Sequence, residues 1–129
     1  MITIEDVEMM LEEIANDFPK ELYDKLNGGI ILLPEEKQSP VSQRNDLYIL
    51  GEYHVDRMMG RYIVIYYGSF VRLFGLLNHE ALKAKLIHTL KHEFIHHLES
   101  LAGEHGLEID DARFIEKYLN RNGKGKDMS

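Results

Sequence analysis

Cysteine is absent from this chain of 129 residues. Without cysteine the chain can form neither a disulfide scaffold nor a thiolate metal site, and its composition fits a reducing compartment. No apolar run approaches the roughly 18 residues that a membrane-spanning helix needs. The first six residues are acidic and lack the basic-then-apolar layout of a signal peptide. Together these absences predict a cytoplasmic protein with no membrane partner.

Basic residues are few: 15 Lys and Arg stand against 22 Asp and Glu, which gives a formal net charge of -7. They are scattered, apart from a short basic run at 121–126, so we expect no nucleic-acid partner. The length suits one compact domain and is too short for two, which predicts a single domain over residues 1–129 with a frayed tail at 121–129. The oligomeric state stays open.

The most informative stretch is the H-E-x-x-H motif at residues 92–96. Residues four apart on a helix lie one turn apart on the same face, so His92 and His96 can point two imidazoles at one metal ion. Glu93 is rotated by about 100° around the helix. Its carboxylate can therefore lie beside the metal and take a proton from a metal-bound water. We expect zinc, although nickel or iron also suits these ligands.

A polar stripe on a His-rich surface helix is the alternative interpretation of this motif. Polar side chains inside an apolar helix need partners, and a metal ion supplies one. The zinc interpretation is favoured because apolar residues surround the motif and predict a mostly buried helix: Leu82, Leu86, Ile87, Leu90, Phe94, Ile95, Leu98 and Leu101.

The third metal ligand is left open by the sequence, although catalytic zinc usually has three protein ligands and a water. Glu99 shares the face of His96, but on a straight helix it lies far along the axis for direct ligation and fits more easily as a partner of His96. Asp110 or Asp111 could return to the metal after a chain break at 103–106. Acidic residues also suit the first turn of a helix for electrostatic reasons. Water or another group is a further alternative.

The other histidines are given smaller roles. His88 lies four residues before His92, but Thr89 stands where the glutamate of a second motif would be. His97 is rotated off the metal face, which predicts a packing or supporting role. Surface positions are expected for His54 and His79.

Periodicity and turn residues predict an α+β domain, with helices against one layer of sheet. The expected helices span 4–17, with Thr3 and Asp6 as its cap, then 19–26, Asn78 to about Ala102, and 109–120. The expected strands span 30–33, 47–55 and 61–67, the last two forming an antiparallel hairpin. Residues 35–46 are expected to form an exposed loop, 68–70 to break the last strand, and 71–77 to form a short helix or turn.

This layout resembles the zincin metallopeptidase core, and most closely the small bacterial zincin-like metallopeptidases, a family of single-domain proteins once described as a domain of unknown function. Three features carry the resemblance: HEFIHH at 92–97, IVIYYG at 63–68, and Phe18-Pro19 with Leu22. It covers about residues 3–120. Many relatives read H-E-x-x-H-x-x-G-x-x-D, whose Gly and Asp positions are Glu99 and Ala102 here, so the third ligand departs from the pattern.

The resemblance implies a minimal zincin fold with a small, mainly antiparallel sheet, one zinc ion per chain, and hydrolysis of a peptide or protein substrate. It also implies that the substrate lies along an edge strand, here 61–67. In this hypothesis Glu93 is the general base, and the oxyanion donor is sought among Tyr66, Tyr67 and His105. The alternatives are a zinc-binding, non-catalytic regulatory or protein-binding module, whose site would be closed by four protein ligands, and a metal-free α+β domain.

Overall fold

Helix α1 (Ile4–Asp17) opens the computed structural model, which describes residues 2–41 and 47–105. The Thr3 hydroxyl accepts from the Asp6 N–H at 3.1 Å, and the Asp6 carboxylate accepts from the Thr3 N–H at 3.0 Å. This reciprocal cap satisfies two backbone donors that the first turn leaves free. The helix ends at Phe18, whose extended backbone is what a following proline requires. The helix and its cap are confirmed.

The predicted second helix over 19–26 is wrong in type and length. Only a short 3₁₀ helix, η1 (Lys20–Tyr23), forms after Pro19, and it buries Leu22. Lys25 then adopts a left-handed conformation, with φ of 66°, which a continuing right-handed helix excludes. The chain turns there and enters strand β1 (Gly29–Leu33).

The sheet has the strand order β1-β3-β2, with β2 spanning Gly51–Asp56 and β3 spanning Gly60–Tyr66. Strands β2 and β3 form the predicted antiparallel hairpin, whereas β1 pairs in parallel with β3. The fold class is α+β as expected, and the sheet is mixed. The expectation that residues 61–67 form an edge strand is wrong. Strand β3 is central, which agrees with its run of buried β-branched residues.

Strand β2 begins four residues later than predicted, because residues 47–49 pair elsewhere. The Ser39 N–H donates to the Leu47 carbonyl and the Ile49 N–H donates to the Lys37 carbonyl, both at 2.8 Å. Part of the predicted loop is therefore tied to the segment before β2. Residues 42–46 lie outside the described part of the chain.

Strand β3 ends before residues 68–70, as expected, but these residues already belong to helix α2 (Tyr67–Phe74), which begins earlier than the short helix or turn predicted over 71–77. Gly68 is helical here and packs so closely on the backbone of Glu35 and Glu36 that a side chain would collide with it. Helix α3 (His79–His105) follows, and the Asn78 Oδ1 accepts from the Ala81 N–H at 2.8 Å, which confirms the predicted N-cap. The predicted helix over 109–120 lies outside the described residues.

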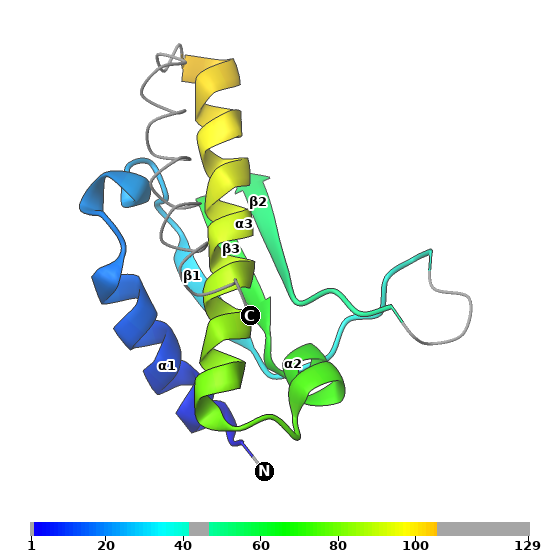
Figure 1. Cartoon of the computed structure of the whole chain (residues 1–129). Helices are drawn as coiled ribbons and strands as arrows, with labels where there is room; N and C mark the ends of the chain where they lie inside the picture. Colours follow the sequence, from blue (N-terminus) through cyan, green and yellow to red (C-terminus); the bar gives the residue numbers. More distant parts are fainter. Residues whose placement is uncertain (1, 42–46, 106–129) are drawn as a thin grey trace.

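Helices α1 and α3 cover one face of the sheet, where the core forms (Figure 1). Helix α3 contributes a buried residue at every fourth position: Leu82, Leu86, Leu90, Phe94 and Leu98. This stripe packs with Ile63 and Ile65 of β3 and with the buried face of α1. No helix in the described part of the chain combines the length and the apolar character needed to cross a membrane.

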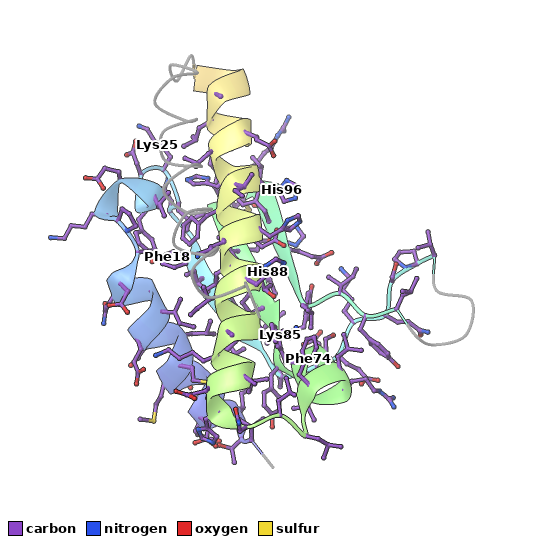
Figure 2. The ribbon with its side chains drawn as sticks, in the orientation of Figure 1. Phe18, Lys25, Phe74, Lys85, His88 and His96 are labelled. Atoms are coloured by element: carbon purple, nitrogen blue, oxygen red, sulfur yellow. The ribbon has the colours of Figure 1, made fainter. Side chains whose placement is uncertain are left out.

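Phe94 links this core to the motif, because it lies between Glu93 and His96 in sequence. Its ring packs edge-on against Phe18 and Tyr23, at centroid distances of 5.5 and 5.2 Å. Figure 2 shows Phe18 on one side of α3, toward α1, and His96 on the other. Burial of Phe94 therefore sets the rotation of the helix and turns the motif histidines away from the core.

Candidate functional site

His92 and His96 lie next to each other on the side of α3 that faces β2. Their Nε2 atoms are 3.1 Å apart, and their rings meet edge to face with centroids 4.6 Å apart. Two nitrogens bound to one tetrahedral zinc at about 2.0–2.1 Å would be roughly 3.3–3.4 Å apart. The pair is already near the separation that a shared metal ion would require, so these donors fit a divalent metal.

The charge state of His92 also suits a metal site. Burial lowers the pKa of His92 below its ordinary value, and the neighbouring His96 lowers it further. Both effects act because the protonated ring loses hydration and is repelled by positive charge nearby. A neutral imidazole is the form that binds metals, so His92 is prepared for ligation at neutral pH.

Glu99 contacts the other nitrogen of the His96 ring, with its Oε1 3.4 Å from Nδ1. A carboxylate on that side favours the tautomer that leaves Nε2 free for a metal. The geometry thus favours Glu99 as the partner of His96 over direct ligation. Among the described residues, no group of three or more His, Asp or Glu side chains is arranged to hold a metal ion. Asp110 and Asp111 lie outside those residues, and the third ligand stays a prediction.

Glu93 lies beside the two histidines and is almost fully buried, with 5% of its surface exposed. Burial raises the pKa of its carboxyl group, because the ionised form loses hydration. A raised pKa brings the group closer to neutral pH, where a general base is most effective.

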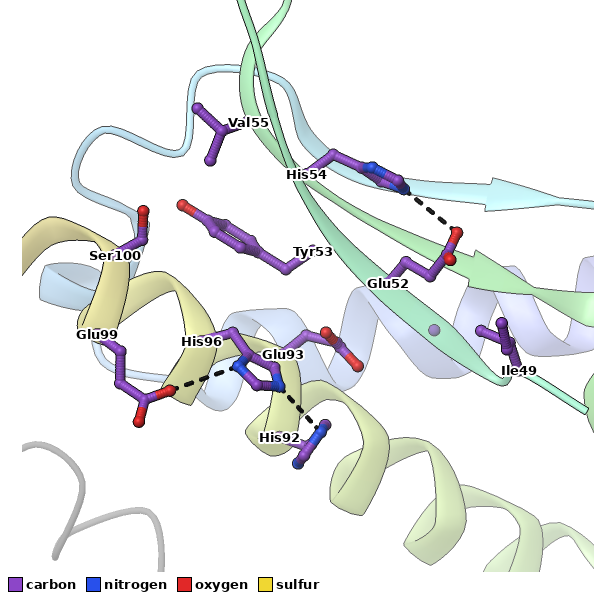
Figure 3. Close-up of a pocket in the computed structure, with 11 residues that line it drawn as sticks. Ile49, Glu52, Tyr53, His54, Val55, His92, Glu93, His96, Glu99 and Ser100 are labelled. Carbon is purple, nitrogen blue, oxygen red and sulfur yellow. Dashed lines mark hydrogen bonds and ion pairs between the residues drawn. The ribbon is translucent and has the colours of Figure 1, made fainter. Parts of the chain in front are cut away.

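A groove of about 710 Å³ separates β2 from α3 and contains the three motif side chains (Figure 3). A further hollow of about 320 Å³ extends it along α3 to His88 and, on the other wall, to Tyr48. The two walls are also close at Gly51, where a Cβ atom would be 3.0 Å from Cγ2 of Thr89. His88, a minor candidate for metal ligation, therefore lines the extension of the groove and not the larger hollow.

The edge of β2 borders this groove. The Tyr66 N–H donates to the Leu50 carbonyl at 2.9 Å, which fixes the phase of the β2–β3 ladder. In an antiparallel pair, every second residue of a strand directs both its N–H and its C=O to the partner strand. The residues between them direct both groups away from the partner, toward the outer side of the strand. Within the described chain, β2 pairs only with β3. Three residues of β2 thus present unpaired N–H and C=O groups along the groove: Gly51, Tyr53 and Val55.

His97 is completely buried, as expected for a residue rotated off the metal face. Its ring is 2.7 Å from the Tyr53 hydroxyl and 2.8 Å from the Asp24 carbonyl. Burial lowers its pKa, against the opposing effect of the Asp24 carbonyl. His97 is therefore a neutral link between α3 and β2.

Glu52 and His54 also line the groove. His54 lies at the surface as expected, with 38% of its side chain exposed, whereas no sequence pattern singled out Glu52. His54 Nε2 is 3.2 Å from the Glu52 carboxylate, which also accepts from the Tyr66 hydroxyl at 2.6 Å and from Lys37 at 2.9 Å. Figure 3 shows both side chains on the side of β2 away from Tyr53. The alternation of side chains along a strand predicts that residues 52 and 54 lie on the same face of β2. It does not predict that these residues border a groove.

Tyr66 and Tyr67, two of the predicted oxyanion donors, do not line the groove. The Tyr66 hydroxyl donates to Glu52, and the Tyr67 hydroxyl donates to the Ile2 carbonyl at 2.6 Å. Neither residue lines the groove, so the geometry does not support this role for them. The side chain of His105 is outside the described part of the structure.

No protein-family model matches the chain, and no curated protein matches it. Among solved structures, the chain is similar to a conserved hypothetical protein from Thermo thermophilus, with 32% sequence identity and a TM-score of 0.66. The match covers 78% of this chain and 98% of that protein.

Proposed function

The chain belongs to the same family as the conserved hypothetical protein from Thermo thermophilus, and we propose that it is a zinc-dependent peptidase. One observation carries the proposal: two imidazole nitrogens 3.1 Å apart lie beside a buried glutamate, at the wall of an open groove. His92 and His96 would hold the zinc ion. Glu99 would hold His96 from its other nitrogen.

Zinc, when bound, supplies a water of lowered pKa and a Lewis acid for the scissile carbonyl. Glu93 acts as the general base: its carboxylate accepts a proton from the attacking water and delivers it to the leaving amine nitrogen. Its burial favours this cycle, because a carboxylate whose pKa is raised binds the water proton more strongly.

In this proposal an extended peptide binds along the outward edge of β2. The segment 61–67, first expected to form the edge strand that binds the substrate, lies mostly in β3, the central strand of the sheet. The outward backbone groups of Gly51, Tyr53 and Val55 pair with the backbone of the peptide. Pairing of this kind recognises an extended chain with little dependence on its side chains. It also brings a peptide bond next to Glu93, which lines the same groove.

The test compares wild type with Glu93→Gln, His92→Ala and, as a matched control, Glu80→Gln, an exposed glutamate in the first turn of the same helix. Elemental analysis should find about one zinc per chain in every protein except His92→Ala. Mass spectrometry of a peptide library should show cleavage by wild type and Glu80→Gln, and a loss of about 10²–10⁴-fold in Glu93→Gln.

Equal cleavage by wild type and Glu93→Gln would contradict the role of Glu93. Bound zinc without cleavage by any variant would instead support the non-catalytic binding module. No zinc in wild type, even after zinc is added back, would refute both interpretations.

A further inference from the structure

His97 directly follows the second motif histidine, and both of its ring nitrogens are used inside the protein. Because a carbonyl can only accept a hydrogen bond, Nε2 carries the proton and donates it to the Asp24 carbonyl at 2.8 Å. Nδ1 is then an acceptor, and it receives the Tyr53 hydroxyl at 2.7 Å. The two ring nitrogens thus have different roles, with Nε2 as donor and Nδ1 as acceptor.

The Tyr53 hydroxyl oxygen has a second partner, which fixes the direction of its proton. Arg61 Nη1 donates to this oxygen at 2.9 Å and also contacts the Ser100 hydroxyl on α3. Because Arg61 is itself a donor, the Tyr53 hydroxyl directs its own proton to Nδ1 of His97. The resulting chain of hydrogen bonds joins β3, β2, α3 and the turn after η1, and a fully satisfied network of this kind rigidifies the elements that it joins.

The position of this network matters for the groove. Tyr53 is the middle one of the three β2 residues whose backbone groups face outward, and His97 is adjacent to His96. Within residues 2–41 and 47–105, strand β2 is held by β3 on one side only, and strands with few partners open most easily. A link from the centre of β2 to the motif helix therefore controls how far the two walls of the groove stand apart.

We propose that His97 and Tyr53 are positioning residues that set the separation between the outward edge of β2 and the metal-binding face of α3. The structural part of this inference is independent of catalysis. Its consequence for peptide binding rests on the proposed function.

The experiment uses Tyr53→Phe, which keeps the ring and removes the hydroxyl. Tyr67→Phe is the matched control, because it removes a hydroxyl that donates to the Ile2 carbonyl at 2.6 Å, remote from the groove. Hydrogen exchange is measured by mass spectrometry on the full chain. In Tyr53→Phe, the amides of Glu52, His54 and Asp56, which pair with β3, should exchange about tenfold faster or more, since a buried acceptor loses its donor. In Tyr67→Phe they should exchange as in wild type.

Equal exchange of the amides of Glu52, His54 and Asp56 in the two variants would overturn the inference. If Tyr53→Phe does not fold, the same comparison is made with His97→Phe, which keeps a ring and removes both nitrogens. On library peptides that wild type cleaves, Tyr53→Phe should raise KM about tenfold, change kcat less, and leave the zinc content unchanged. Unchanged KM would refute the link to binding. If wild type cleaves no peptide, the proposed function fails while the exchange result still decides the positioning role.

Discussion

Replacing Gly51 by alanine tests how closely β2 is held against α3, because this position has no space for a side chain. A Cβ atom there would be 3.0 Å from Cγ2 of Thr89, 3.1 Å from Cδ1 of Ile65 and 3.1 Å from the carbonyl oxygen of Val64. Favourable contacts between carbon atoms lie at about 3.5–4.0 Å. The three neighbours would therefore have to move by several tenths of an ångström.

Overpacking of this degree lowers the free energy of unfolding by about 1–3 kcal/mol. The Thr89 contact can be isolated with Thr89→Ala, which removes Cγ2 together with the hydrogen bond from Oγ1 to the Lys85 carbonyl at 2.9 Å. That single change should cost about 1 kcal/mol. The double variant should lose at least about 0.5 kcal/mol less than the sum of the two single variants, because the methyl group that opposes the new Cβ is absent.

Urea unfolding followed by circular dichroism gives the free energy for all four proteins of this cycle. A Gly51→Ala variant as stable as wild type would refute the reasoning, since β2 and α3 would then be further apart than the structure has them. Additive losses, within about 0.3–0.5 kcal/mol, would show that Thr89 is not the residue in conflict.

Two further predictions concern the core and the groove. Phe94→Ala should lower the free energy of unfolding by about 3–5 kcal/mol, because it empties the space between Phe18 and Tyr23; urea unfolding checks this, and a loss below about 1 kcal/mol would contradict the burial of the motif helix. For Glu52, burial opposes ionisation, but hydrogen bonds from Tyr66 and Lys37 outweigh it and lower the pKa of the carboxyl group. Its stabilising effect is thus present above the unfolded-state value of about 4.3 and is lost as the pH falls through the lower folded value. Wild type should therefore lose more stability than Glu52→Gln between pH 7 and pH 3, and parallel pH curves of unfolding free energy would count against it.

The starts of α1 and α3 were predictable because they depend on residues close in sequence. Thr3 and Asp6 cap α1, and Asn78 caps α3, through hydrogen bonds that span three residues. The failure at 19–26 has a local cause that periodicity does not report, the left-handed backbone of Lys25. Gly68 was interpreted only as a strand breaker, and the reason for the glycine is not local. A side chain there would collide with the backbone of Glu35 and Glu36, which belong to a distant segment.

The motif was predictable for the same reason as the caps. Spacing on one helix brings His92 and His96 together whatever the rest of the chain does, and the structure has their Nε2 atoms 3.1 Å apart. Helical spacing also puts Glu99 within reach of His96, but on its far nitrogen. A metal ligand from another segment of the chain has no defined spacing from the motif. The third ligand could therefore not be identified from the sequence.

By itself, therefore, the sequence determined the α+β class, the long motif helix and the pair of histidines, because each rests on contacts between residues a few positions apart. Only the tertiary structure decided that β3 is central, that β2 borders the groove, and that Tyr53 meets His97 across 44 residues of sequence. Strand order depends on which surfaces are buried when the whole chain is packed. The residue pattern of a strand is local, and it does not name the strands that will pair with it once the whole chain is packed.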